Sequence, residues 1–175
     1  MAPLRGFCAG LRAGGARGDE VPEFDPLDGG TGARLLLLLE KPGPGTSPAR
    51  GGSGFVSRDN PDPTAAATRR FLAEAGTARD DTIIWNTAPW WNGTIRFTAA
   101  ERARGLAALP HLLALLPRLS TVILAGNQAA RVRPSLEGRG LSLHVSAHPS
   151  PQVRAAMPER WGVIPAIWAE AARSL

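Results

Sequence analysis

The sequence has almost no cysteine and no long apolar run. Cys8 is the one cysteine among 175 residues, so a single chain cannot form a disulfide, a cysteine zinc site or an iron–sulfur cluster. The leucine run Leu35–Leu39 is far too short to cross a bilayer, and the N-terminus lacks the continuous apolar segment of a signal peptide. We therefore expect a cytoplasmic protein without a membrane partner.

Lysine is scarce as well, and arginine carries nearly all of the positive charge. Lys41 is the one lysine among 20 basic residues, and the formal net charge is +5. Residues 1–33 carry three Arg against five acidic residues, whereas residues 34–175 carry 17 basic against ten acidic residues. Arginine suits bidentate phosphate contacts, so nucleic acid is a candidate partner. A GC-rich coding bias explains the same Arg-, Ala-, Gly- and Pro-rich composition equally well.

The length and the 43% hydrophobic content indicate one globular domain. Residues 1–20 are rich in Gly, Ala and Arg, and we expect a flexible segment there and the folded domain over residues 21–175. Strands are predicted over residues 34–40, 82–86, 121–125 and 141–145, and helices over 64–75, 98–116, 127–132 and within 158–174. This alternation predicts a three-layer α/β/α fold with a central, mostly parallel four-stranded sheet.

Every predicted strand ends in a polar or glycine-rich segment. The four segments cover residues 40–44, 86–91, 126–128 and 148–151. In open α/β sheets, ligands bind outside the carboxyl ends of the strands, so the four segments predict one shared cleft. Proline has a fixed φ and no N–H, and the prolines that follow His148 therefore hold this histidine on a stiff loop.

This set of motifs resembles the uracil-DNA glycosylase superfamily. That family has a Gly-(Gln/Glu)-(Asp/Ala/Asn)-Pro loop after its first core strand and an aromatic residue shortly afterwards. It also has an Asn at the end of a later strand and a His-Pro-Ser-(Pro) loop near the C-terminus. The matching positions are residues 40–43, Phe55, Asn86 and residues 148–151, and residues 124–129 resemble the family's Trp-Gly-Ser-type turn. The matches follow the family order from about residue 35 to about residue 155.

The resemblance implies a monomeric DNA glycosylase that hydrolyses the N-glycosidic bond of uracil in DNA and so starts base-excision repair. It implies no metal and no cofactor. The base would leave the duplex and enter a pocket, where Phe55 would stack on its ring. Asn86 would hydrogen-bond the O4 and N3–H edge and select uracil over cytosine. His148 would donate to O2 as negative charge develops on the leaving base.

The carboxylate of this reaction departs from the family pattern. Lys41 occupies the position where the best-known branch of the family has its water-activating Asp. Glu40 matches the Glu of the thermophilic iron–sulfur branch, whose four cysteines this chain lacks. We expect Glu40 to stabilise the cationic sugar or to orient the attacking water, with Asp59 as the second candidate. Asn60 and Lys41 are expected to contact the substrate.

Other residues near these motifs are expected to contact DNA. The family places an apolar wedge after the His-Pro-Ser-Pro loop, where this chain has Gln152. Arg154 would fill the gap left by the flipped base or bind a phosphate. The full set of expected DNA contacts is Ser57, Arg58, Ser150, Gln152 and Arg154.

Two alternatives remain open. Lys41 in place of an acid favours a catalytically weak member of the superfamily that binds a DNA lesion or a nucleotide. The other alternative is an unrelated α/β hydrolase or nucleotide-binding protein, although the chain has neither a Ser nucleophile elbow nor the Gly-Lys-Ser/Thr ending of a P-loop. Four further residues are expected to be structural, namely Trp90, Trp91, His111 and His144.

Overall fold

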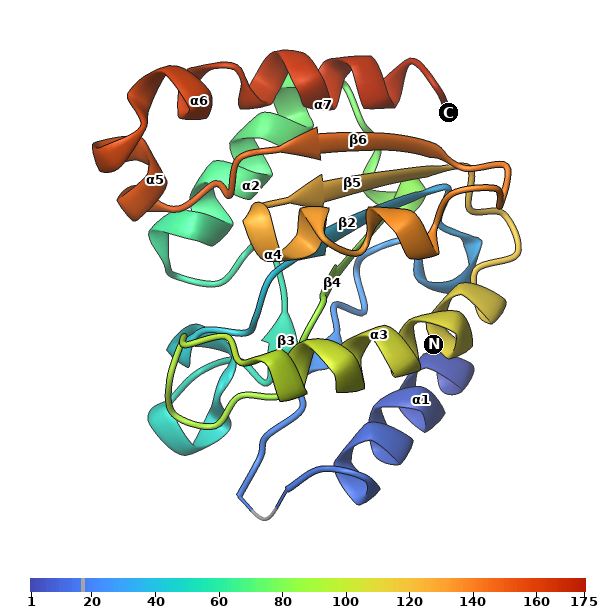
Figure 1. Ribbon diagram of the computed structural model, residues 1–175, viewed down its shortest axis with the longest axis vertical. Helices are drawn as coiled ribbons and strands as arrows, with labels where there is room; N and C mark the ends of the chain where they lie inside the picture. The colour runs from blue at the N-terminus through green and yellow to red at the C-terminus, as the bar shows by residue number, and fades with distance from the viewer. Residues whose placement is uncertain (17) are drawn as a thin grey trace.

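A central parallel sheet organises the fold in the computed structural model, which describes residues 1–16 and 18–175. Its strand order is β4 (Thr82–Asn86), β2 (Leu35–Leu39), β5 (Thr121–Ala125) and β6 (Ser142–Ser146). All neighbouring pairs are parallel, and Figure 1 shows the four arrows side by side. Every residue of β4, β2 and β5 is buried, which explains why these strands are continuous apolar runs rather than alternating patterns.

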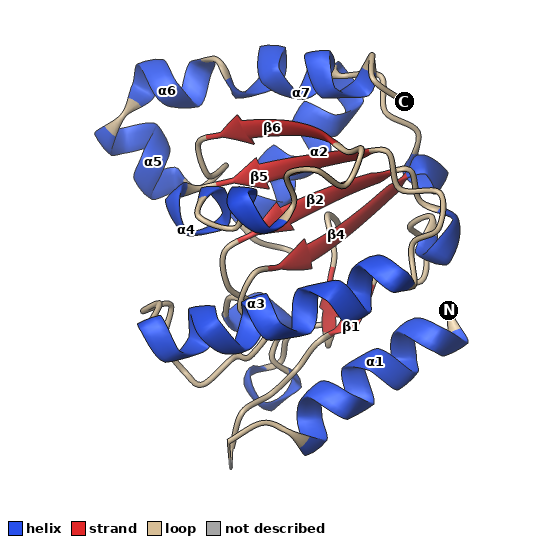
Figure 2. Ribbon diagram, turned by 45° about the vertical axis from the view of Figure 1, so that its right-hand side comes forward, coloured by secondary structure: helices blue, strands red, loops and turns tan. Residues whose placement is uncertain are grey.

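Helices cover both faces of this sheet, as Figures 1 and 2 show. On one face, α7 (Ile164–Ala172) contacts β5, β6 and α2 (Pro63–Glu74); α3 (Ala99–Ala114) and α1 (Ala2–Ala13) lie on the other. The shorter helices are α4 (Asn127–Ala130), α5 (Pro151–Ala156) and α6 (Pro158–Gly162). The predicted three-layer fold with a four-stranded parallel sheet is confirmed. None of the described helices is both long enough and apolar enough to cross a bilayer.

Side-chain caps set the start of α2 and α3. The carboxylate of Asp62 accepts hydrogen bonds from the Thr64 and Ala65 N–H groups and begins α2. Thr98 and Glu101 form a reciprocal capping box that begins α3. The predicted single helix within residues 158–174 divides instead into α6 and α7.

The expectation of a flexible segment over residues 1–20 is wrong for residues 2–13, which form α1. Leu4, Cys8 and Leu11 recur at helical spacing and are buried in the core. Burial, with the nearby Glu23 carboxylate as a further cause, raises the pKa of the Cys8 thiol to about 12 and keeps it protonated. This segment is rich in Gly, Ala and Arg, so its narrow apolar stripe is hard to recognise in the sequence. The stripe stabilises the helix because it packs against the rest of the domain.

Two short strands form a second, smaller sheet beside the central one. β1 (Glu23–Phe24) pairs in parallel with β3 (Phe55–Val56), and the Phe24 ring stacks on Trp85 of β4 with 3.8 Å between ring centroids. β3 therefore brings the long loop that follows β2 back to the domain. Trp90 and Trp91 are buried, as expected of structural residues.

Gly105 allows α3 to approach the backbone that follows β4. A Cβ atom at this position would lie 1.8 Å from the carbonyl oxygen of Thr87, next to Asn86. We expect Gly105→Ala to lower the free energy of unfolding by about 1–3 kcal/mol, although alanine has the higher helix propensity. Urea denaturation tests this, with Gly10→Ala in α1 as the control because a Cβ there meets nothing within 4 Å. Equal effects at the two glycines would contradict the close approach.

Candidate active site

The polar segments that follow the four strands meet in one cavity of about 620 Å³ at the carboxyl edge of the sheet. Glu40 follows β2, Asn86 ends β4, Gly126 follows β5 and His148 follows β6, and all four line this cavity. The prediction of one shared cleft is confirmed. The volume lies within the range of small-molecule sites.

Asn86 presents a hydrogen-bond donor that no described residue satisfies. Its side chain is 3% exposed and lines the cavity, and its Nδ2 is buried without a hydrogen-bond partner in the described chain. A buried polar group left unpaired costs about 1–3 kcal/mol. A ligand acceptor in the cavity would remove this cost.

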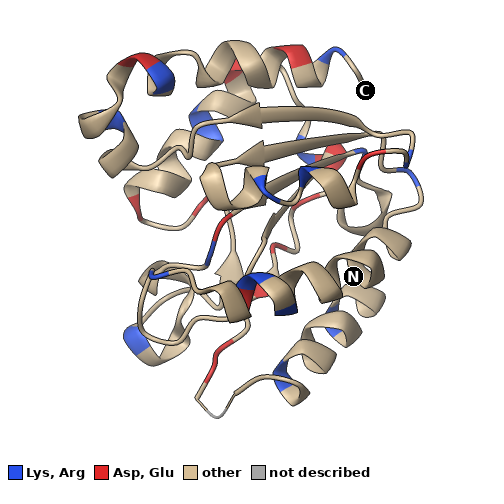
Figure 3. Ribbon diagram, in the orientation of Figure 1, with Lys and Arg blue, Asp and Glu red and all other residues tan. Residues whose placement is uncertain are grey.

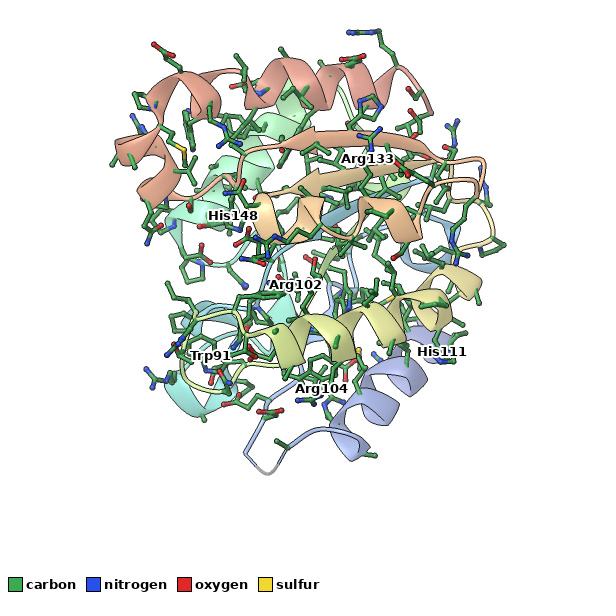
Figure 4. All side chains as sticks on the ribbon, viewed as in Figure 1. Trp91, Arg102, Arg104, His111, Arg133 and His148 are labelled. Atoms are coloured by element: carbon green, nitrogen blue, oxygen red, sulfur yellow. The ribbon has the colours of Figure 1, made fainter. Side chains whose placement is uncertain are left out.

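His148 lines the same cavity from the loop after β6, and Figure 4 shows it at the end of that strand, beside α4. Burial lowers the pKa of His148 to about 4. The imidazole is therefore neutral at pH 7 and carries one N–H donor. Ser150 supports the loop, because its Oγ accepts a hydrogen bond from the Val153 N–H and begins α5.

The carboxylate of Glu40 is held against the chain that follows β5. Its Oε1 accepts a hydrogen bond from the Gln128 N–H at 2.8 Å. Gly126 permits this approach, since a Cβ there would lie 2.5 Å from Oε1 and its φ of 107° favours glycine. Among the described residues no hydrogen bond engages Oε2, so one carboxylate oxygen is fixed and the other is available to a ligand.

The ammonium of Lys41 is bound to the protein rather than free for a substrate. It donates to Asn92 Oδ1 at 2.8 Å and to the Arg96 carbonyl at 3.1 Å, and it forms an ion pair with Glu101. Burial raises the pKa of Glu101, but hydrogen bonds from Lys41 and Thr98 outweigh it and lower the pKa below its ordinary value. These three acceptors use all three N–H groups of Lys41. Lys41 lines the cavity, but a substrate contact by its ammonium would have to displace one of these acceptors, and the expected contact stays a prediction.

Asp59 does not reach the cavity. Its carboxylate, 41% exposed, pairs with Arg79 at 2.7 Å and with Arg69 at 3.8 Å, and it is not among the lining residues. Its neighbours Ser57 and Asn60 do line the cavity, but both side chains make internal hydrogen bonds. Ser57 Oγ donates to Asp25, and Asn60 Nδ2 donates to the Phe55 carbonyl at 3.0 Å. Of the two expected carboxylates, only Glu40 lies in the site.

Arg58 lines the cavity, but its side chain is buried and paired within the protein. Its Nη2 lies 3.1 Å from Oδ1 of Asp28. Burial raises the pKa of Asp28 to about 6, and it lowers the pKa of Arg58, so the loss of hydration outweighs the attraction within the pair. The phosphate contact expected of Arg58 would have to break this buried pair, and it stays a prediction.

Phe55, the expected stacking residue, is not among the residues that line the cavity; Val56 is. Successive side chains of a strand point to opposite faces, and in β3 Val56 is the buried one. Among the described lining residues there is no Phe, Tyr or Trp, and the apolar walls come from aliphatic residues instead. A two-residue strand has no alternation from which the sequence could identify the inward face.

The rim of the cavity contains some of the expected DNA contacts and two residues that the sequence did not indicate. Ser150 and Gln152 line it, but Arg154 does not, since its guanidinium lies over the Trp161 ring at 5.1 Å from the centroid. Arg160 and Ile95 line the rim unexpectedly. Both lie outside the four strand-end segments that the sequence indicates, so their positions had no sequence signal. Figure 3 shows basic and acidic residues intermingled around the ribbon, so the cavity marks the site more clearly than charge does.

Comparison with known proteins adds one kind of finding, a distant structural similarity. No family model matches the chain, and no curated protein sequence matches it. Among solved structures, the chain is similar to a mutant of the UNG, a uracil-DNA glycosylase, from Nitratifractor salsuginis. The two are 18% identical, with 79% of this chain and 74% of the other covered, at a TM-score of 0.42. A similarity of this size carries no argument about function.

The buried position of Arg58 predicts a loss of stability, and no change in DNA contacts, when it is replaced. Arg58→Met should lower the free energy of unfolding by about 3 kcal/mol, because it removes one of the two guanidinium groups that offset the buried charge of Asp28, the other being that of Arg79. Arg154→Met is the control, because Arg154 is exposed to solvent. It should change the free energy of unfolding by less than about 1 kcal/mol. Urea denaturation at pH 7 measures both. A negligible loss for Arg58→Met would contradict the buried pair.

Proposed function

We propose that the protein is a uracil-DNA glycosylase that hydrolyses the N-glycosidic bond of uracil in DNA and leaves an abasic site, the first step of base-excision repair. One observation carries the proposal. A buried amide donor without a partner, on Asn86, and a neutral imidazole, on His148, line the same cavity. Uracil presents O4, N3–H and O2 along one edge, and these two side chains supply the complementary groups.

Base selection follows from the amide of Asn86. Its Nδ2 donates to O4 and its Oδ1 accepts from N3–H, so that both polar atoms of the side chain are satisfied. Cytosine reverses this pattern, because it has an amino group at C4 and an acceptor at N3. Each mismatched polar contact costs about 1–3 kcal/mol in a buried site. The target nucleotide reaches Asn86 by leaving the base stack.

The hydrolytic step uses His148 and Glu40. The bond between C1′ and N1 of the base breaks, and the electron pair leaves with uracil as an anion. The neutral imidazole donates its N–H to O2, where negative charge develops. Glu40, held through Oε1, uses Oε2 to stabilise the positive sugar and to accept the proton of the water that adds to C1′. We propose a monomeric cytoplasmic enzyme that acts on uracil in single- or double-stranded DNA without metal or cofactor.

A second candidate is a catalytically weak protein that binds a DNA lesion or a nucleotide at the same cavity. The observation in its favour is Lys41, which occupies the position of an expected acid and whose ammonium is fully engaged within the protein. A single-turnover assay with protein in excess over uracil-containing DNA separates the candidates, because a binding protein retains the DNA without releasing the base.

Replacement of the two donors tests the site assignment. His148→Ala should lower the single-turnover rate of uracil release by about 10²–10³-fold, since it removes a donor aimed at developing charge. Asn86→Asp should weaken the selection of uracil, because a carboxylate cannot donate to O4. His111→Ala, on α3 and outside the cavity, is the control and should leave the rate unchanged. Unchanged release by both site variants would show that the assignment is wrong.

The two candidate carboxylates are separated by a matched pair of substitutions. Glu40→Gln should lower the rate of uracil release by about 10²-fold or more, the usual contribution of a positioned general base. Asp59→Asn should have little effect, because Asp59 lies outside the cavity in ion pairs with arginines. Single-turnover assays on the same oligonucleotide compare them. The reverse result would assign the water-activating role to Asp59.

The protonation of His148 gives a prediction about pH. Because burial lowers its pKa from 6.5 to about 4, the imidazole stays neutral between pH 8 and pH 5, and it should cause no loss of activity in that range. The unfolded chain takes up this proton near pH 6.5, so the stability due to neutral His148 is present above that pH and is lost as the pH falls towards 4. Titration of the imidazole by NMR measures the pKa directly, and a midpoint near 6.5 would contradict the prediction.

A further inference from the structure

Ile95 is an apolar side chain exposed at the mouth of the cavity. It is 68% exposed, more than any other exposed large hydrophobic residue of the described chain, and it lines the cavity that holds Asn86 and His148. Scattered exposed apolar residues need no special explanation. Ile95 differs from the others because none of the other large hydrophobic residues exposed in the described chain lines this cavity.

The local backbone presents Ile95 at the apex of a tight turn. Gly93 has a φ of 85°, which turns the chain, and the hydroxyl of Thr94 accepts a hydrogen bond from the Arg96 N–H at 3.1 Å. This bond closes the turn around Ile95. The side chain is β-branched and therefore stiff at χ1, so it keeps its shape when it meets a partner.

Lys41 anchors this turn to the catalytic edge of the sheet. Its ammonium binds Asn92 before Ile95 and the Arg96 carbonyl after it, while Glu101 joins both Lys41 and Asn92. The turn is thus tied on both sides of Ile95 to the residue next to Glu40. Because the turn is held on both sides, the Ile95 side chain can contact a ligand without displacing the turn.

The opposite rim offers a polar side chain instead. Gln152 lies in the first turn of α5, after the His148 loop, and it is exposed at the cavity. A glutamine amide that enters a stack of bases gives up hydrogen bonds to water without gaining apolar contact. An isoleucine loses no such bonds and gains contact with the faces of the bases.

We infer that Ile95 enters the base stack of duplex DNA and fills the space left by the extruded nucleotide. Proteins that kink or open DNA use apolar side chains of this kind as wedges between base steps. The inference rests on the proposed function, because only a base that leaves the stack creates the space. A single-stranded substrate has no opposing strand and no duplex stack to repair, so the role of Ile95 is confined to duplex DNA.

The test compares uracil release by Ile95→Ala from a duplex and from the corresponding single strand under single-turnover conditions. We expect a loss of about tenfold or more on the duplex and less than about twofold on the single strand. Leu27→Ala is the matched control, since Leu27 is 63% exposed and does not line the cavity, and it should leave both rates unchanged. Ile95→Leu should restore most of the duplex rate.

A fluorescence measurement provides a second readout. A 2-aminopurine next to the uracil should brighten when the unmodified protein opens the duplex, and Ile95→Ala should reduce this signal. Equal rates for Ile95→Ala and the unmodified protein on the duplex, or a duplex loss for Gln152→Ala in its place, would overturn the inference while leaving the proposed function standing. Failure of the unmodified protein to release uracil from either substrate would overturn both.

Discussion

Parallel pairing of four short strands in one register is the constraint on which the site depends. Leu39 pairs with Asn86, and Ala125 pairs with Ser146, so the chain leaves the sheet at nearly the same level in every strand. The residues that follow must then meet at one edge, whatever their separation in sequence. Three of the four strands, β4, β2 and β5, are buried on both faces, which makes this register costly to shift and keeps Glu40, Asn86 and His148 in one cavity.

Burial acts in opposite ways on the polar groups around this cavity. The groups that carry full charge, Lys41 and Arg58, are paired with Glu101 and Asp28, because an unpaired buried charge costs far more than an unpaired buried dipole. Among the described residues no hydrogen bond engages the Nδ2 of Asn86, and both this amide and the imidazole of His148 are neutral. For the neutral base of the proposed function, Asn86 and His148 would offer directed donors, while the charges of Lys41 and Arg58 are held in ion pairs.

The sequence predicts the position of a side chain when that side chain follows a readable strand. It does not predict the position where tertiary packing sets it. Asn86 and His148 could be predicted because each lies at the end of an apolar strand whose limits are readable. The side chains of Phe55 and Arg58 could not, because they lie around a two-residue strand that gives no alternation, and a buried ion pair redirects Arg58. Helix α1 was missed because its apolar stripe consists of three residues within a Gly- and Ala-rich segment.

Lys41 stands where the family has an acid. The place of its ammonium decides whether this difference opposes the proposed glycosylase reaction. A free ammonium in the cavity would oppose the positive charge that develops on the sugar, at a cost of about 4 kcal/mol for two charges 4 Å apart in an effective dielectric of about 20. The ammonium of Lys41 is instead held by its ion pair with Glu101 and by two further acceptors, at the turn that carries Ile95. Lysine at this position therefore removes one acid without adding a repelling cation. In the proposed reaction the electrostatic demand would fall on Glu40, since the other carboxylate that lines the cavity, Asp62, caps α2.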